Sequence, residues 1–92
     1  MNRAFEYDSA KSESNNKKHG IGFEDAKLVW NDEFALVAPT KHVEGERRLI
    51  IVGIIAEKIW TVVYTLRADS IRIISARRAR KEEVAYYEKN ND

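Results

Sequence analysis

Three runs of β-branched and aliphatic residues in the second half of the chain constrain its fold more than any other feature. They cover residues 48–55, 59–66 and 71–77, with only three or four residues between one run and the next. Connections this short join antiparallel neighbours, because a parallel pair of strands needs a crossover of about a dozen residues. The sequence therefore predicts a three-stranded antiparallel meander. Gly53, inside the first run, indicates a bulge or a close approach of another element.

Two further strands and three helices are expected around the meander. Residues 4–7 alternate in character, with Phe5 and Tyr7 on one face, and residues 34–38 form an apolar run that ends at Pro39. The helices are expected over residues 9–18, 23–30 and 79–89. We therefore predict a two-layer α+β fold in which the helices cover one face of the sheet.

The two N-terminal helices differ in how they can be stabilised. Asp8 is a good N-cap for the first helix and Gly20 suits the position after its end, but this helix has no large apolar residue. Its stability must come from its neighbours, or its polar face is used for binding. The second helix has an apolar face, which we assign to Phe23, Ala26, Leu28 (or Lys27, at the margin) and Trp30.

Length and composition exclude several classes of function. Ninety-two residues make a single domain, with a core over about residues 4–88. The chain has no cysteine, which excludes disulfides, thiolate metal sites and cysteine nucleophiles. Its carboxylates are scattered, with no H-x-x-x-H or D-x-D spacing, so a metal-dependent mechanism is disfavoured and no cofactor is expected.

Charge and hydropathy limit the partners. Sixteen basic and fifteen acidic residues give a net charge of +1, so an affinity for nucleic acid must come from local patches. No segment approaches the ~18–20 apolar residues of a membrane span, and the N-terminus does not read as a signal peptide. We therefore expect a cytoplasmic protein without a membrane partner.

Basic residues gather where the third run of the meander ends. Residues 70–80 read S-I-R-I-I-S-A-R-R-A-R, so Arg77, Arg78 and Arg80 leave a stiff strand within four residues. The guanidinium is a fork of donors that matches phosphate geometry, which makes this stretch a candidate phosphate site. The alternative is that Arg77 pairs with a nearby carboxylate and that Arg78 and Arg80 are solvated surface.

The first helix presents a second group of candidates. Lys11, Asn15 and Lys18 share one of its faces and could follow an RNA backbone. His19, at the end of the helix, can titrate near neutral pH. The structural alternatives are that the lysines pair with carboxylates on an exposed face, and that His19 hydrogen-bonds the terminal carbonyls of the helix.

A third group lies at the start of the meander. Glu46 and Arg48 are two residues apart and face the same way if the polar loop over residues 39–47 enters the strand there. They could act together on a substrate, or they could form a plain ion pair. Trp60 and Tyr64 could stack on a base, but their hydrophobic strand favours core packing.

Several motifs together resemble the BrnT-type toxins of bacterial type II toxin–antitoxin systems. The most specific are K-x-x-x-N-x-x-K-H-G from Lys11 to Gly20 and R-I-I-S-A-R from Arg72 to Arg77. The others are F-E-Y-D at 5–8, F-E-D-A at 23–26, Glu46 with Arg48, Glu83, and Tyr87-Glu88. The resemblance covers about residues 5–88. The family more often carries Trp where this chain has Tyr7, a conservative change at a packing position.

The resemblance implies a small RelE-like fold and a ribonuclease activity that arrests translation. It also implies neutralisation by a cognate ribbon-helix-helix antitoxin, which carries the DNA binding of the complex. The α+β outline that the residue pattern predicts is compatible with that fold. Two other functions are alternatives to the ribonuclease: a non-catalytic toxin of related fold that acts on a protein such as DNA gyrase, and a simple nucleic-acid-binding module.

Metal-free cleavage of RNA needs a base for the 2′-hydroxyl, donors for the phosphoryl oxygens and an acid for the leaving 5′-oxygen. Our hypothesis assigns proton transfer to His19 and Glu46, and phosphate binding to Arg48 and Arg77. The residues assigned to substrate binding are Lys11, Asn15, Lys18, Arg72, Arg78 and Arg80.

Overall fold

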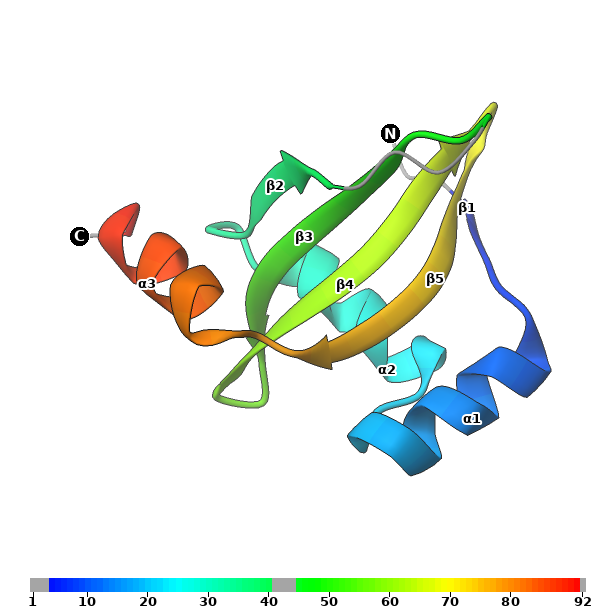
Figure 1. Cartoon of the computed structure of the whole chain (residues 1–92), viewed down its shortest axis with the longest axis horizontal. Coiled ribbons are helices and arrows are strands. Elements are labelled where there is room, and N and C mark those ends of the chain that lie inside the picture. Colours follow the sequence, from blue (N-terminus) through cyan, green and yellow to red (C-terminus); the bar gives the residue numbers. More distant parts are fainter. Residues whose placement is uncertain (1–3, 41–44, 92) are drawn as a thin grey trace.

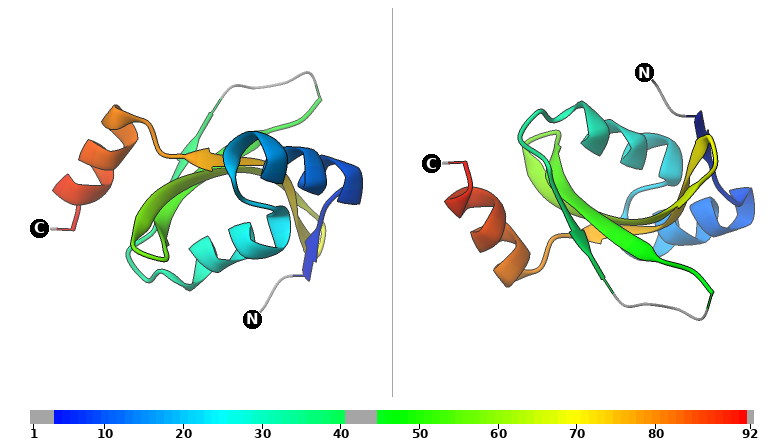
Figure 2. Two further views of the ribbon diagram at one scale, coloured as in Figure 1. Left: turned by 90° about the horizontal axis from the view of Figure 1, so that it is seen from below. Right: turned by 90° about the horizontal axis from the view of Figure 1, so that it is seen from above.

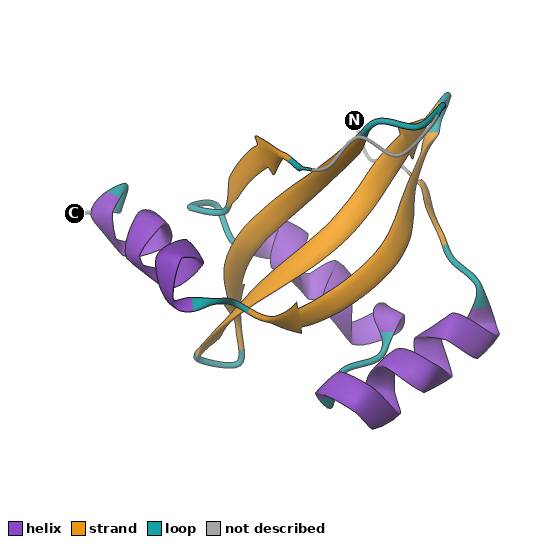
Figure 3. Cartoon of the chain, in the orientation of Figure 1, coloured by secondary structure: helices purple, strands orange, loops and turns teal. Residues whose placement is uncertain are grey.

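The structure, a computed structural model, describes residues 4–40 and 45–91, so part of the predicted loop over residues 39–47 lies outside it. The elements are β1 (Ala4–Glu6), α1 (Ser9–His19), α2 (Phe23–Ala26), the 3-10 helix η1 (Lys27–Asn31), β2 (Leu36–Pro39), β3 (Arg48–Ile55), β4 (Lys58–Arg67), β5 (Ser70–Arg78) and α3 (Lys81–Lys89). Figures 1 and 3 show their arrangement. The predicted order of strands and helices is confirmed.

The described strands form one sheet in the order β1-β5-β4-β3-β2. β3, β4 and β5 are consecutive antiparallel neighbours, which confirms the meander, and β2 extends it on the side of β3. β1 lies parallel to β5 but pairs only with its first three residues, from Ser70 to Arg72. The backbone N–H and C=O groups along the rest of the outer edge of β5 therefore have no partner in β1.

The sheet curls around α2 and η1, which fill its concave face (Figure 2). The buried positions on these helices are Phe23, Ala26 and Val29, each less than 2% exposed. Leu28, which we expected on the apolar face, is instead 47% exposed. The reason is that the segment tightens into a 3-10 helix, whose three residues per turn bring positions i, i+3 and i+6 onto one side.

Gly53 explains how closely this helical segment approaches the sheet. A Cβ atom at position 53 would lie 2.8 Å from Cγ2 of Val29 and 3.1 Å from Cβ of Ala35. The contact with Val29 is too close for a side chain and the one with Ala35 is tight, so the expectation of a close approach at Gly53 is confirmed.

The polar helix α1 is held against the outer edge of β5 by Asn15. This side chain is only 8% exposed, and its Nδ2 donates to the carbonyl oxygens of Ile21 and Ala76, both at 2.8 Å. Its Oδ1 accepts from the backbone N–H of Ala76 at 3.2 Å. The amide thus pairs with β5 as a neighbouring strand would, in the part that β1 leaves uncovered.

Helix α3 departs from the expectation that all helices cover one face. Its residue Glu83 accepts from Thr61, whose side chain points away from the face that α2 covers, because Trp60 and Val62 point toward it. Farther along α3, the hydroxyl of Tyr87 donates to Oδ2 of Asp32 at 2.6 Å. Burial and this hydrogen bond raise the pKa of Tyr87 to about 12.

Candidate active site

The sheet face opposite α2 carries two groups of charged side chains, one toward each end of its strands. Cross-strand neighbours place Arg48, Thr65 and Arg72 in one row and Thr61 and Arg77 in another. We call the first group, comprising Glu6, Glu46, Arg48, Arg67 and Arg72, the open cluster. We call the second group, comprising Thr61, Arg77 and Glu83, the closed cluster.

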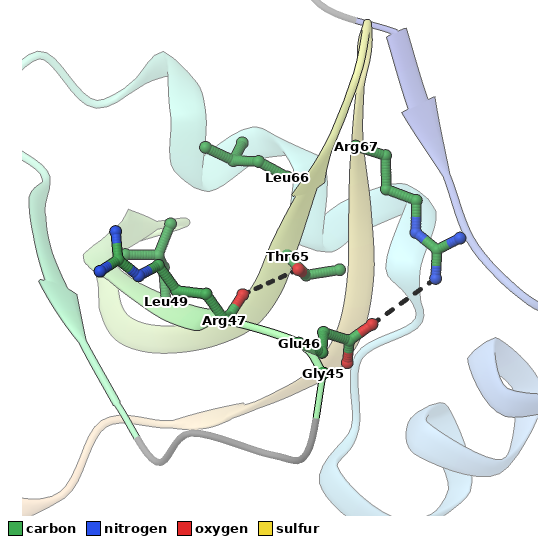
Figure 4. Close-up of a pocket in the computed structure, with 7 residues that line it drawn as sticks. All are labelled: Gly45, Glu46, Arg47, Leu49, Thr65, Leu66 and Arg67. Carbon is green, nitrogen blue, oxygen red and sulfur yellow. Dashed lines mark hydrogen bonds and ion pairs between the residues drawn. The ribbon is translucent and has the colours of Figure 1, made fainter.

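Glu46 lies between two arginines of the open cluster. The Nε of Arg48 donates to its Oε1 at 3.1 Å, and Nη2 of Arg67 lies 3.6 Å from its Oε2. Figure 4 shows the contact with Arg67. The expectation that Glu46 and Arg48 face the same way is therefore confirmed. The carboxylate keeps access to solvent, because its side chain is 28% exposed.

Glu6 of β1 organises the other side of the open cluster. Its Oε1 accepts from the hydroxyl of Ser70 at 2.8 Å and lies 3.9 Å from Nε of Arg67. Its Oε2 lies 3.5 Å from Nη1 of Arg72. These contacts bring the start of the chain to β4 and β5, so that two arginines from different strands are directed toward the same region.

A hollow of about 200 Å³ lies within the open cluster. It is lined by Asp8, Lys11, Glu46, Arg48, Arg67, Arg72, Ile73 and Ile74. Four of these residues are cationic and two are acidic, and Asp8 is already committed because its Oδ1 accepts from the backbone N–H of Ala10 and Lys11. The hollow therefore has more donors than its own carboxylates can satisfy, which is what a phosphate group requires.

The closed cluster is a saturated ion pair. Nη1 and Nη2 of Arg77 donate to the two carboxylate oxygens of Glu83 at 2.7 and 2.9 Å. Glu83 also accepts from the hydroxyl of Thr61 at 2.9 Å and from the backbone N–H of Arg80 at 2.7 Å. The hydrogen bonds from Arg77 lower the pKa of Glu83 to about 2. The alternative interpretation of Arg77, pairing with a carboxylate, is the arrangement observed.

The remaining residues that the sequence suggested are dispersed. Arg78 lies over the ring of Trp60, 5.6 Å from its centroid, and Arg80 is exposed at the start of α3. Lys18 and His19 are exposed at the far end of α1 and do not line the hollow that contains Glu46. Asn15 is buried and bonded to backbone groups, so it holds α1 against the sheet. Trp60 and Tyr64 lie in the core, as expected.

The structure thus brings together Lys11, Glu46, Arg48 and Arg72 from the predicted set and adds Arg67. Arg67 lies between the predicted strands over residues 59–66 and 71–77, so it was not among the predicted site residues. Arg67 could have been identified from the pairing of β3 with β4. Thr65 lies opposite Arg48, and Arg67 is two residues after Thr65, so it shares the same face. Among residues 4–40 and 45–91, no group of three or more His, Asp or Glu residues could hold a metal ion.

The fold and the site define a class: a small α+β domain with one antiparallel-rich sheet, whose exposed face presents three arginines around two glutamates. Residues 7–83 match the family model described as the ribonuclease toxin BrnT of type II toxin–antitoxin systems. The chain therefore belongs to the BrnT family of ribonuclease toxins, as its motifs indicated.

A solved structure supports the same assignment. The chain is similar to the crystal structure of the ribonuclease toxin BrnT from Brucella abortus, with 26% sequence identity and a TM-score of 0.69. The match covers 87% of this chain and 100% of the Brucella chain. No curated protein matches the sequence. The predicted α+β fold is thus confirmed by a family member of known structure.

Proposed function

We propose that the open cluster is the active site and that it cleaves RNA without a metal ion. The observation that supports this most directly is the position of Glu46, a partly exposed carboxylate held between Arg48 and Arg67 at the edge of a cationic hollow. A carboxylate can take a proton, and guanidinium groups beside it can hold the phosphate whose neighbouring hydroxyl loses that proton.

The proposed reaction is a transfer within the substrate. Glu46 takes the proton of the ribose 2′-hydroxyl, and the 2′-oxygen forms a bond to the adjacent phosphorus. The bond from phosphorus to the 5′-oxygen of the next nucleotide breaks, which leaves a 2′,3′-cyclic phosphate. Arg48, Arg67 and Arg72 stabilise the negative charge that builds on the phosphoryl oxygens.

The leaving 5′-oxygen needs a proton, and we assign its donation to Lys11. This residue lines the hollow with the three arginines. A guanidinium does not release its proton in proteins, whereas an ammonium can. His19 and Arg77 therefore leave the catalytic set: His19 lies outside the hollow, and the fork of Arg77 is occupied by Glu83.

The biological setting follows from the family. We propose that cleavage arrests translation in the cytoplasm and that a cognate antitoxin of the ribbon-helix-helix type neutralises the toxin. Within the described part of the chain, no helix is long and apolar enough to cross a membrane. Lys18, Arg78 and Arg80 are exposed or partly exposed cations that can add long-range attraction for RNA without contacting the reacting phosphate.

The test is cleavage of a structured RNA by the purified chain in EDTA, with Glu46→Gln as the matched variant. The amide keeps the size of the side chain but cannot take a proton. We expect cleavage in EDTA, 2′,3′-cyclic phosphate ends, and a loss of about 10²- to 10⁴-fold in Glu46→Gln. A substrate in which 2′-deoxynucleotides replace all ribonucleotides should remain intact.

Two results would contradict the proposal. Undiminished cleavage by a folded Glu46→Gln protein would remove Glu46 as the base. Cleavage that stops in EDTA and returns with a divalent cation would show a metal-dependent reaction. If the folded chain cleaves only RNA bound to ribosomes, the same variants are compared on that substrate.

A further inference from the structure

A second hollow, of about 450 Å³, lies directly beside the open cluster (Figure 4). It is lined by Gly45, Glu46, Arg47, Leu49, Thr65, Leu66 and Arg67. Glu46 and Arg67 also line the smaller cationic hollow. The pair that these two residues form is therefore a wall shared by both hollows.

The larger hollow differs from the cationic one in chemistry. Leu49 is half-buried, and Leu66 is 48% exposed. Arg47 is exposed, and its guanidinium forms no hydrogen bond or ion pair with the described residues. The backbone of Arg47 is fixed, because its carbonyl accepts from the hydroxyl of Thr65 at 2.8 Å. The hollow thus combines an apolar wall with a planar cation.

We propose that this larger hollow is a nucleobase subsite, which receives the base of the nucleotide whose 2′-hydroxyl reacts. The inference rests on the proposed function of Glu46. In a nucleotide the ribose lies between base and phosphate. A phosphate in the cationic hollow and a base in the larger one place the ribose over Glu46, where its 2′-hydroxyl must lose a proton.

The lining selects a base over other groups. A base is flat, has two apolar faces and carries polar atoms only at its edge. The guanidinium plane of Arg47 can stack on such a face or donate to the edge, and both modes occur widely in RNA recognition. Leu49 and Leu66 supply the apolar contact. The volume lies within the range of small-ligand pockets, about 300–1,000 Å³.

In this subsite Arg47 contacts the base, whereas Arg48 contacts the phosphate. Arg47 directly precedes β3, and Arg48 is the first residue of that strand. Arg47 lines only the larger hollow and Arg48 lines only the cationic one. Removal of Arg47 should therefore reduce the preference for a substrate that carries the base and leave binding of the phosphate backbone intact.

The experiment uses DNA oligonucleotides that contain one ribonucleotide, either with its base or abasic at that position. Cleavage can occur only at the ribonucleotide, so kcat/KM reports a single site. The wild-type chain should prefer the substrate with the base by roughly 5- to 150-fold, the range for one stacked base. Arg47→Ala and Leu66→Ala should lose most of that preference.

Arg47→Lys and Lys17→Ala are the controls. Lysine keeps the charge and lacks the plane, so Arg47→Lys should lose the preference while it retains cleavage of the abasic substrate. Lys17 is an exposed cation of α1 that lines neither hollow, and its removal should leave the preference unchanged. Equal cleavage of both substrates by the wild-type chain, or an Arg47→Ala protein that keeps the full preference, would overturn the subsite.

A binding measurement separates this inference from the proposed function. Fluorescence anisotropy with the same oligonucleotides, made non-cleavable by a 2′-deoxy sugar, needs no catalysis. A preference for the base that is lost in Arg47→Ala supports the subsite even if Glu46 proves not to be the base of the reaction. The absence of any preference in both binding and cleavage overturns it.

Discussion

The two charged clusters on one sheet face contain the same residue types in opposite states. In the closed cluster, one arginine and one glutamate are joined by two short hydrogen bonds, at 2.7 and 2.9 Å, and the side chains are 22% and 17% exposed. In the open cluster, three arginines share two glutamates through contacts of 3.1–3.9 Å, with side chains that are 28–51% exposed.

The difference shows why a run of arginines does not by itself locate a phosphate site. A bidentate pair uses the donors that a phosphate would need and lowers the exposure of both partners. Shared, longer contacts leave donors directed toward solvent. The closed cluster attaches α3 to the sheet, whereas the open cluster keeps the solvent access that the proposed function requires.

Among the variants that compare the two clusters, the largest effect is expected at Arg67, which was not among the predicted site residues. Arg67→Ala removes a phosphate donor and one support of Glu46, so kcat/KM for RNA cleavage should fall by about 100-fold or more. Arg48→Ala should lower kcat/KM by a similar factor. Both proteins should keep wild-type unfolding curves in urea. Full activity in Arg67→Ala would mean that the open cluster is only a surface ion network.

Arg77→Ala tests the other side of the comparison. It leaves the half-buried carboxylate of Glu83 without its partner, so the free energy of unfolding should drop by about 2 kcal/mol. Activity per folded molecule should be close to wild type. If cleavage disappears while the protein remains as stable as wild type, Arg77 contacts the substrate, as its place in the sequence first indicated.

The pH dependence of stability should carry a smaller signature of the same pair. The pKa of Glu83 is lowered from 4.5 to about 2, so its contribution is complete above pH 4.5 and is lost as the pH falls toward 2. Urea unfolding as a function of pH should show a shallower decline over this interval in Glu83→Gln. The loss of stability in Glu83→Gln is smaller than in Arg77→Ala, because the glutamine side chain can still accept from the hydroxyl of Thr61. Parallel curves for the two proteins would show that the pair is not coupled to folding.

Tyr87→Phe should have a modest effect that is confined to α3. It deletes the hydrogen bond to Asp32, which also accepts from the backbone N–H of Ile54 at 2.8 Å. We expect a loss of about 1 kcal/mol in the free energy of unfolding and unchanged cleavage. Relative to wild type, the substitution should accelerate amide hydrogen exchange more in α3 than in β4. Uniform acceleration across the sheet would mean that Tyr87 supports the whole core.

The smallest effect is expected for His19→Ala. His19 is exposed at the end of α1 and lines neither the cationic hollow nor the larger one. Cleavage of RNA should stay within about twofold of wild type across the neutral pH range. A loss comparable to that of Glu46→Gln would return His19 to the proton-transfer role that the sequence suggested for it.

The sequence was informative wherever one local rule decided the outcome. Short connections determined the meander, Asp8 and Gly20 determined the ends of α1, and Gly53 marked a close approach. The burial of Val29 in place of Leu28 could not be read from the pattern, because a 3-10 helix changes the period from 3.6 to about 3. That change is imposed by packing against the sheet.

The site was predictable only in part, for a different reason. Glu46 and Arg48 are near neighbours in sequence, so their common direction follows from strand alternation. The state of an arginine depends instead on which carboxylate reaches it through space. Glu83 reaches Arg77 because α3 folds back there, and Glu6 reaches Arg72 because β1 pairs with β5. Neither partner follows from spacing along the chain.

The pairing of β1 with β5 has a consequence for how the toxin is made. Glu6 and Arg72 are 66 residues apart, and the cationic hollow draws on residues from Asp8 to Ile74. A chain emerges from the ribosome from its N-terminus onward. The nascent toxin therefore contains Glu46 and Arg48 long before their companions on β4 and β5 exist. On the assignment proposed here, it gains the ability to cut RNA only after β5 has been made and has paired with β1 and β4.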